Sequence, residues 1–398
     1  MENIIPYGKH NINEDDINNV VNVLKSGFLT QGPSIRVFEN DFSNYIGSKY
    51  SVAVSNGTAA LHLCALALGI KTGDKVITSP ITFVASANCI RYCGGEIVFS
   101  DIDPNTYLLD LNKLKQFLDK SPKGTYKAVV AVNFAGRAID LKFLREIADD
   151  YGLSIIEDSC HSPGGYFLDS AGVKYNCGSG KFADLAIFSF HPVKHIACGE
   201  GGMITTNNYE LYRKLLLLRS HGISRNESLF ENSTTIANGF ENTDAKYPGW
   251  YMEMLDLGYN YRLSDIHAAL GLSQLKRANS GLSRRKEIAA IYNNVFKNKG
   301  YIEGHSKLIE GHAYHLYIIE VPNRLGLYNY LRKNNIYCQI HYVPCHLMPY
   351  YKQFGYNVGD FPVSENYYRK CISLPIYPKL TKIEQQYVIE KIDNFYNE

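Results

Sequence analysis

The sequence has no apolar run of the roughly 18 residues that a membrane-spanning helix needs. Its first residues, Met1 to Pro6, lack the basic segment and apolar stretch of a signal peptide. The formal net charge is only +2, from 41 Lys and Arg against 39 Asp and Glu, so the composition indicates no basic surface for a nucleic acid. We therefore expect a cytoplasmic protein with neither a membrane nor a nucleic acid as its partner.

Residue spacings typical of metal sites and disulfide frameworks are also missing. The 9 Cys form no C-x-x-C pair, and the 12 His include no H-E-x-x-H spacing. His312 and His315 lie three residues apart in an apolar run that reads as a strand, where they would point to opposite faces. We expect reduced thiols and no metal site.

Two glycine patterns for binding nucleotide phosphates are absent as well. The chain contains neither G-x-x-x-x-G-K-[ST] nor G-x-G-x-x-G. Their absence disfavours a mononucleotide P-loop and a dinucleotide-binding turn. A nicotinamide-dependent oxidoreductase on a similar sheet stays an alternative, which the absorbance of the purified protein would test.

Short apolar runs alternate with helical segments through the first half of the chain. This alternation predicts an α/β fold with a mainly parallel central sheet and helices on both faces. At 398 residues, the chain can form a large domain over 1–255 and a smaller C-terminal α+β domain over 256–398. The expected strands of the large sheet are 51–55, 76–78, 97–100, 128–134, 154–157, 185–188 and 203–206, and those of the small domain are 314–321 and 336–342.

Ligands of such sheets bind at the carboxyl ends of the strands, so residues just after strands are candidates for a site. Lys194 is the foremost one. It lies on a short connection between two apolar runs, close to Gly199, Gly201 and Gly202, where a backbone can pass close to a ligand. The alternative is an ordinary solvated loop lysine.

Three further segments follow strands in the same way. Gly57 and Thr58 open a helix, whose free N–H groups and positive dipole end suit an anion, although an ordinary helix cap is the alternative. Phe83 follows the next strand and would otherwise be plain core. Asp158 ends a strand and would otherwise cap a helix.

The segments Ser189-Phe190-His191-Pro192-Val193-Lys194 and Gly199-Glu200-Gly201-Gly202 resemble the lysine loop of the DegT/DnrJ/EryC1/StrS sugar aminotransferases. The stretches 257–265, 341–344 and 373–378 also match that family, so the resemblance covers essentially the whole chain. It implies a fold-type I enzyme that uses pyridoxal 5′-phosphate (PLP). It also implies a homodimer with shared active sites.

The resemblance assigns a role to each candidate. It implies that Lys194 bonds to the cofactor and then moves a proton as general base and acid. Arg262 would help to bind an anionic group. The cofactor would contact Gly57 and Thr58 at its phosphate, Phe83 on its ring face, Asp158 at its ring nitrogen, His161 at its phenolic edge, and Ser189, while Asn260 would reach the phosphate of the neighbouring subunit.

The substrates follow from the resemblance alone. The amino donor is expected to be glutamate and the acceptor a nucleotide-linked keto-sugar. The His-Pro-Val-Lys loop and Trp250-Tyr251 are most similar to the branch that aminates UDP-2-acetamido-2,6-dideoxy-β-L-arabino-hex-4-ulose for pseudaminic acid. Tyr7 and His341 would line the sugar pocket. A GDP- or dTDP-linked 4-keto sugar stays open, as does a non-catalytic relative that only binds the cofactor or the nucleotide sugar.

Two features near the expected site are the residue beside Lys194 and the polar segment 225–248. His195 departs from the small or hydroxyl residue expected beside the lysine, while Lys194 itself favours transamination over the dehydration catalysed by family members with His there. The polar segment 225–248 has no clear periodicity, and we expect a surface loop over the site.

Overall fold

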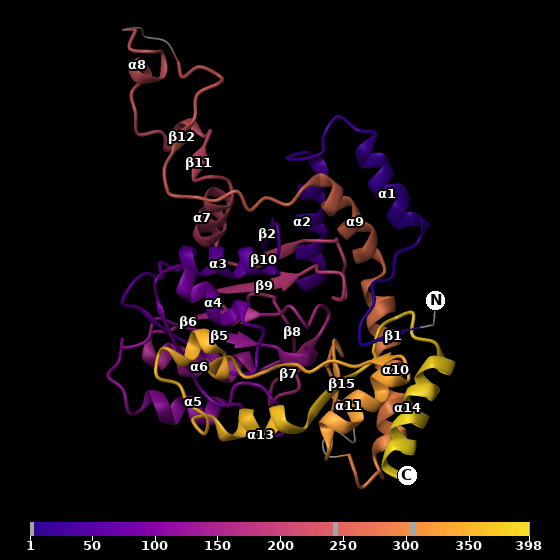
Figure 1. The fold of residues 1–398 in the computed structure, drawn as a ribbon. Helices are drawn as coiled ribbons and strands as arrows, with labels where there is room; N and C mark the ends of the chain where they lie inside the picture. The colour runs from indigo at the N-terminus through magenta and orange to yellow at the C-terminus, as the bar shows by residue number, and fades with distance from the viewer. Residues whose placement is uncertain (1–3, 242–245, 303–307, 398) are drawn as a thin grey trace.

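The computed structural model describes residues 4–241, 246–302 and 308–397. Its centre is a seven-stranded sheet in the order β2-β10-β9-β6-β5-β3-β4 (Figure 1). Every neighbouring pair is parallel except that β10 runs antiparallel to β2 and β9. The predicted mainly parallel sheet is confirmed. Its strands are β2 (Tyr50–Val54), β3 (Lys75–Thr78), β4 (Glu96–Phe99), β5 (Ala128–Val132), β6 (Ser154–Asp158), β9 (Leu185–Ser189) and β10 (Gly202–Thr206).

Helices cover both faces of this sheet, as the alternation predicted. Successive side chains of a strand point to opposite faces, and β5 shows the result. Val130 packs into the cluster under α3 and α4, while Val129 and Ala131 pack into the cluster under α5 and α6. Both faces of the sheet are therefore buried core. The helices are α3 (Gly57–Ala67), α4 (Ala85–Tyr92) and α7 (Tyr209–Arg219) on one face, and α5 (Leu111–Leu118) and α6 (Leu141–Tyr151) on the other.

Two N-terminal helices pack against a later one. Helix α1 (Glu14–Leu24) begins at Asn13, whose side chain accepts from the Asp16 N–H and whose own N–H donates to the Asp16 carboxylate. Both α1 and α2 (Pro33–Ile46) contact α9 (Asp265–Lys276). The N-terminal segment is thus anchored to the part of the chain that leads into the C-terminal region.

The C-terminal region has its own core and small sheets. Strand β13 (Tyr317–Glu320) pairs with β15 (Cys371–Leu374), and β14 (Ile336–Tyr337) pairs with β1 (Ile5–Pro6). Strands β13 and β14 are shorter than the predicted strands 314–321 and 336–342. The chain after β14 leaves the sheet before His341. The boundary at residue 255 stays a prediction. The helices here are α10 (Ala278–Phe296), α11 (Arg324–Lys333), α12 (Pro349–Lys352), α13 (Pro362–Lys370) and α14 (Lys382–Asn397).

A long segment after α7 projects from the body, and we call its described residues, 222–241 and 246–258, the arm (Figure 1). Its base is a pair of short strands, β11 (Ile223–Ser224) and β12 (Glu253–Met254), and it includes the short helix α8 (Thr234–Ala237). A second small hairpin, β7 (Tyr166–Leu168) with β8 (Lys174–Asn176), lies beside the main sheet. Among the described residues, no helix combines the length and apolar character needed to cross a bilayer.

Candidate active site

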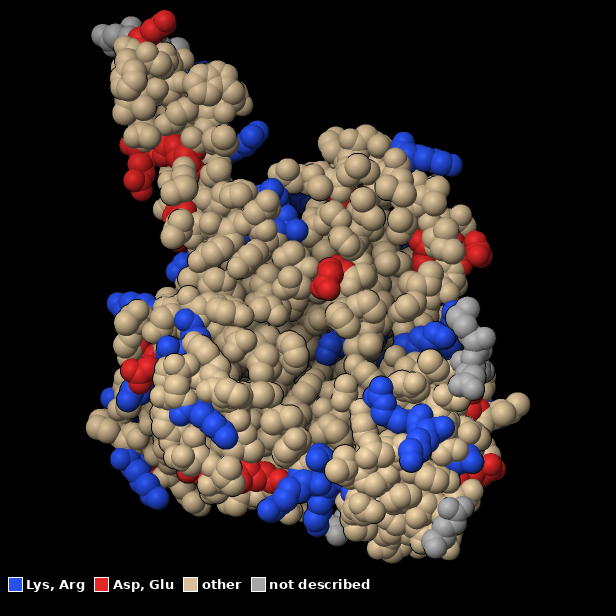
Figure 2. Space-filling model, in the orientation of Figure 1, with Lys and Arg blue, Asp and Glu red and all other residues tan. Residues whose placement is uncertain are grey.

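A cavity of about 1000 Å³ lies at the carboxyl edge of the central sheet. Val132, Asp158 and Ser189, the last residues of β5, β6 and β9, all line it. Figure 2 shows a hollow in the middle of the molecule's face, bordered mainly by uncharged side chains. The sheet thus delivers its strand ends to one site, as expected for this architecture.

The turn after β2 brings the start of α3 close to β9. Asn56 is the N-cap, and its side-chain oxygen accepts from the Ala59 N–H at 2.8 Å. The N–H groups of Gly57 and Thr58 precede the first intrahelical bond and are available to an anion. A Cβ on Gly57 would lie 3.0 Å from the Cβ of Ser189, so glycine permits this close approach.

Asp158 reaches the cavity from the end of β6. Its Oδ2 accepts a hydrogen bond of 2.7 Å from Ser86 Oγ, and its Oδ1 accepts one of 3.1 Å from the Cys160 N–H. The Thr82 hydroxyl oxygen lies 2.8 Å from that of Ser86 and forms a hydrogen bond with it. Glu157 points to the opposite face and bonds to backbone and polar groups there. The carboxylate of Asp158 is therefore held in one orientation by groups behind it.

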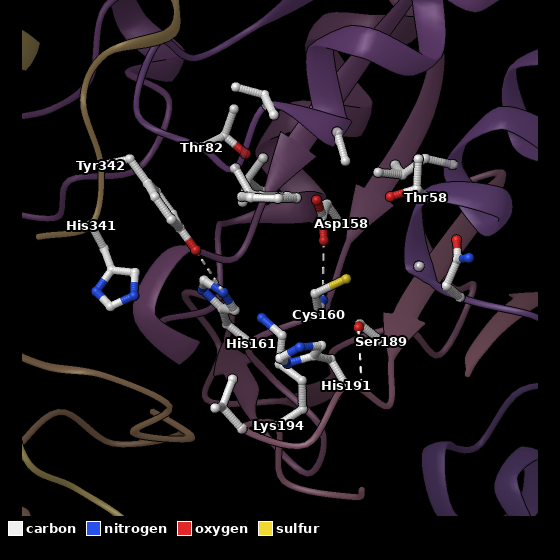
Figure 3. A pocket seen from close by; sticks show the side chains of 18 of the residues that line it. Thr58, Thr82, Asp158, Cys160, His161, Ser189, His191, Lys194, His341 and Tyr342 are labelled. Atoms are coloured by element: carbon white, nitrogen blue, oxygen red, sulfur yellow. Dashed lines mark hydrogen bonds between the residues drawn. The ribbon is translucent and has the colours of Figure 1, made fainter. Parts of the chain in front are cut away.

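Lys194 extends into the space between His161 and Cys160 (Figure 3). Its backbone N–H donates to His191 O at 2.8 Å, which fixes the turn after β9. Burial lowers the pKa of the Lys194 ammonium; Cys160 and Asp158 oppose that shift, and Arg285 adds to it. A lowered pKa favours the neutral, nucleophilic amine.

His161 has a tautomer that its partners fix. Its Nδ1 accepts from the Ala135 N–H at 3.2 Å, so its Nε2 carries the proton and lies 3.4 Å from Tyr342 Oη. Burial holds the pKa of His161 well below its usual value, with Lys194 adding to the shift. The ring is a neutral donor toward the cavity.

Three more predicted residues line the same cavity. Phe83 is 57% exposed although it is a large apolar side chain, and its ring lies 6.1 Å from that of Tyr342. Tyr7 and His341 lie with their rings 5.1 Å apart, and His341 Nδ1 is 2.9 Å from Ser373 Oγ. The cavity therefore offers an aromatic face available to a ligand.

The remaining predicted residues do not line this cavity, although Tyr261, which stands between them in the sequence, does. Asn260 is exposed and Arg262 is half-buried, and neither lines the cavity of its own chain. The expectation that segment 225–248 covers the site is wrong for the described residues. The arm projects away from the body (Figure 1), and no described residue of it lines the cavity. The pair of strands β11 and β12 closes the base of the arm.

Several residues in or behind the cavity wall escaped the sequence interpretation. Tyr342 stands in a stretch that matched the family, yet nothing in the pattern showed that its hydroxyl meets His161. Ser86 lies on α4, one helical turn after Thr82, and only the fold brings it to Asp158. The Arg285 side chain lies behind the site from a helix far along the chain.

Comparison with known proteins decides which chemistry this geometry serves. Residues 10–393 match the model of the DegT/DnrJ/EryC1/StrS aminotransferase family. The chain belongs to this family. It is therefore a PLP-dependent sugar aminotransferase.

Similar proteins span nearly the whole chain. An uncharacterised protein of Methanocaldococcus jannaschii is 40% identical, and the match covers 96% of this chain and 94% of that protein. The spore coat polysaccharide biosynthesis protein SpsC of Bacillus subtilis is 37% identical, with 98% of this chain and 96% of SpsC covered. The UDP-4-amino-4,6-dideoxy-N-acetyl-beta-L-altrosamine transaminase of Campylobacter jejuni is 33% identical, with 97% and 96% covered.

Two solved structures have the same fold throughout. Helicobacter pylori PseC, an aminotransferase involved in the biosynthesis of pseudoaminic acid, is 28% identical, with a TM-score of 0.86 over 99% of this chain and 100% of PseC. The PLP form of Spr1654 from Streptococcus pneumoniae is 27% identical, with a TM-score of 0.85 over 99% of each chain.

The residues around the cavity fit this cofactor. A helix N-terminus suits its phosphate, an exposed aromatic ring suits its flat face, and the carboxylate of Asp158 suits its ring nitrogen. Lys194 extends into the same space with a lowered pKa. Among the described residues, no cluster of His, Cys, Asp or Glu is arranged to hold a metal ion.

Proposed function

We propose that this aminotransferase moves an amino group from glutamate to the 4-keto carbon of UDP-2-acetamido-2,6-dideoxy-β-L-arabino-hex-4-ulose. The similarity to the Campylobacter jejuni transaminase over 97% of the chain is the observation that carries the proposal. The likeness to PseC supports it, and a cavity of about 1000 Å³ has room for a nucleotide-linked sugar. The product sugar would leave with the amino group at C4, and glutamate would leave as 2-oxoglutarate.

Bound PLP supplies the electron sink for this reaction. The chain's own residues would hold it and move the protons. Lys194 would take the proton from the carbon of glutamate that bears the amino group in the first half-reaction, and it would deliver a proton to C4 of the sugar in the second. Asp158, oriented by Ser86, would keep the ring nitrogen protonated. His161 would donate a hydrogen bond from its Nε2–H to the phenolic oxygen.

The remaining contacts would divide between phosphate, ring and sugar. Gly57, Thr58 and Ser189 would hold the cofactor phosphate through N–H and hydroxyl groups. Phe83 would stack on the cofactor ring. Tyr7 and His341 would bind the sugar. Burial lowers the pKa of His341 to about 3, so it would act as a neutral hydrogen-bonding group.

A homodimer with shared active sites belongs to the same proposal. Asn260 would reach the cofactor phosphate of the neighbouring subunit, and Arg262 would bind an anionic group beside it. Neither lines the cavity of its own chain, although Tyr261 between them does, and Asn260 is exposed. The arm carries exposed apolar side chains that a second copy would cover, among them Phe240 (80% exposed) and Trp250 (68% exposed).

The acceptor is tested with a panel of nucleotide sugars. The PLP-loaded enzyme would be given glutamate with the UDP-linked 2-acetamido-4-keto sugar, or with GDP- or dTDP-linked 4-keto-6-deoxy sugars. Mass spectrometry would follow the aminated sugar, and an enzymatic assay would follow 2-oxoglutarate. Turnover with the UDP-linked sugar well above the others supports the proposal. Preference for a GDP- or dTDP-linked sugar contradicts it.

Sharing of sites is tested by mixing two inactive variants, Lys194→Ala and Asn260→Ala, after partial unfolding and reassembly. In a mixed dimer with shared sites, one site combines an intact Lys194 with an intact Asn260 from the other subunit. Activity should therefore return on mixing. A mixture as inactive as its components, although light scattering shows dimers, would contradict the sharing of sites.

A further inference from the structure

The side chain of Tyr342 is held firmly where it lines the cavity (Figure 3). Its ring centroid lies 6.1 Å from that of Phe83 and 6.0 Å from that of Phe134. The backbone just before it is fixed as well, because Tyr367 Oη donates to His341 O at 2.6 Å. The hydroxyl of Tyr342 is therefore kept at one place in the cavity, and the roles proposed above leave it unused.

The partners of His161 decide where the proton of this hydroxyl can go. The Ala135 N–H donates to His161 Nδ1 at 3.2 Å, so Nε2 carries the ring proton. This Nε2 lies 3.4 Å from Tyr342 Oη and cannot accept a hydrogen bond from it. In the part of the chain that the structure describes, Tyr342 Oη has no other hydrogen-bond partner. Its O–H proton is therefore free for a ligand.

Both side chains of this pair stay neutral at neutral pH. Burial raises the pKa of the Tyr342 hydroxyl well above its ordinary value, and Tyr7 and Asp158 add to the shift. Burial holds the pKa of His161 well below its usual value. The pair thus offers the cavity two neutral donors, the Nε2–H of the imidazole and the O–H of the tyrosine.

Two oxygen atoms need donors at this place in the proposed reaction. One is the phenolic oxygen of the cofactor, which His161 would serve. The other is the oxygen on the carbon that exchanges it for the amino group. That carbon must come close to Lys194, and Lys194 extends into the space beside His161 (Figure 3).

We propose that Tyr342 is a further catalytic residue, whose hydroxyl donates a hydrogen bond to the oxygen on the reacting carbon of each substrate. This carbon is C4 of the keto-sugar in one half-reaction and C2 of 2-oxoglutarate in the other. The inference rests on the proposed function and adds to it the group that polarises the carbonyl. A donor that the fold already holds in place needs no reorganisation as charge develops on the oxygen.

The exchange at the reacting carbon balances without ionising the tyrosine. In the sugar half-reaction, the C4–N bond forms, the C4–O bond breaks and the oxygen leaves as water. Both hydrogens of this water come from the incoming amino group by way of Lys194, so Tyr342 keeps its own proton. In the glutamate half-reaction, water supplies the oxygen to C2 and the C–N bond breaks. The same hydrogen bond therefore serves both halves.

Tyr342→Phe removes the hydroxyl alone, and single-turnover absorbance separates the two half-reactions. The band of the PLP form is lost with glutamate and returns with the keto-sugar. We expect the variant to slow both changes on the order of 10²-fold, the effect of losing one fixed donor. The absorption of the resting enzyme should stay unchanged, because His161 still serves the phenolic oxygen. Wild-type rates in both half-reactions, with or without a shifted resting spectrum, would overturn the inference.

Tyr351→Phe is the matched control for loss of a tyrosine hydroxyl. Tyr351 is 1% exposed, its Oη donates to Asn88 Oδ1 at 2.6 Å, and it does not line the cavity. This variant should lower the free energy of unfolding and leave both half-reactions at wild-type rates. If it slowed them as much as Tyr342→Phe does, the loss would come from packing and would contradict a catalytic hydroxyl.

Unreactive sugars test the hydrogen bond without turnover. Calorimetry on the PLP-loaded wild-type enzyme would compare a UDP-linked sugar that has a hydroxyl at C4 with its 4-deoxy analogue. The C4 oxygen can accept from Tyr342, so the first should bind about five- to tenfold more tightly. In Tyr342→Phe the two affinities should be nearly equal. Equal affinities in the wild-type enzyme would contradict the inference even if the variant folds poorly.

The two half-reactions also separate this inference from the proposed acceptor. The glutamate half-reaction involves no sugar. A wild-type enzyme that reacts with glutamate but not with the UDP-linked keto-sugar would refute the proposed acceptor. A slow glutamate half-reaction in Tyr342→Phe would still support the role of the hydroxyl, and a wild-type rate there would still contradict it.

Discussion

The two sides of the cavity around Lys194 differ in the ionisable side chains that they carry. On one side, which we call the acidic wall, Asp158 keeps its carboxylate among hydrogen-bond donors from Ser86 and Cys160. On the other, which we call the histidine wall, four buried imidazoles are neutral and one arginine is charged, and the residues are His161, His195, His315, His341 and Arg285.

The difference between the walls matches two opposite needs. A ring nitrogen must stay protonated, which requires a charged carboxylate beside it. A nucleophilic lysine must lose its proton, which requires desolvation or a nearby positive charge. In the proposed site, Asp158 with Ser86 from α4 would serve the first need, and the desolvated surroundings of Lys194 would serve the second.

Replacing the residue between the walls should have the largest effect. We expect Lys194→Ala to lower kcat by at least about 10⁴-fold, because both the bond to the cofactor and the proton transfer are lost. Lys181→Ala, at an exposed lysine in the same region of the chain, should keep wild-type turnover. A steady-state assay with glutamate and the keto-sugar measures both. Near-normal turnover of Lys194→Ala would show that Lys194 is not the catalytic lysine.

The acidic wall is tested with two neighbouring acids that point to opposite faces of β6. Asp158→Asn should lower kcat on the order of 10²- to 10³-fold, as expected when one charge-stabilising group is removed. Glu157→Gln should instead lower the free energy of unfolding by about 1–3 kcal/mol, because its buried bonds to Asn133 and the Gly178 N–H are disturbed. Kinetics and denaturant titration would separate the two effects, and equal kinetic losses would refute the comparison.

The orientation of Asp158 is a finer test of the same wall. Ser86→Ala should lower kcat by about tenfold, because a bond to a charged group is worth about 1.5–3 kcal/mol and only part of it bears on the transition state. The absorption of the bound cofactor should shift as well. Ser43→Ala, which removes another buried hydroxyl bond, should cost stability alone. Loss of stability without a kinetic or spectral change would reduce Ser86 to a packing role.

The histidine wall predicts that the free energy of unfolding depends on pH. The pKa of His341 is lowered to about 3 in the fold, against about 6.5 when unfolded. The unfolded chain therefore binds an extra proton between these values, so the free energy of unfolding falls as pH drops below about 6.5. His341→Gln should lessen this slope by about one proton, up to roughly 1.4 kcal/mol per pH unit. Exposed His10→Gln should leave it unchanged; denaturant titrations between pH 4 and 7 give both slopes, and equal slopes in both variants would contradict a neutral His341.

Local patterns in the sequence predicted the sheet and much of the acidic wall. Periodicity identified the strands of the central sheet to within about two residues, and Asp158 was a candidate because it ends one of them, whereas Ser189 came from the family resemblance. The histidine wall could not be read this way. Arg285 meets the Ile376 carbonyl across 91 residues of sequence, and no spacing rule links them. The arm was misjudged because its polar composition fits both a lid and a projection.

The central claim is that Lys194 is the lysine that bonds to PLP between the two walls. Borohydride reduction of the freshly loaded enzyme would make that bond permanent, and peptide mass spectrometry would locate it. The account predicts the modified pyridoxyl group on the peptide that contains Lys194, with no such peptide when glutamate is added first, because glutamate displaces the lysine. A label on another lysine, or a label on Lys194 that glutamate does not remove, would contradict it.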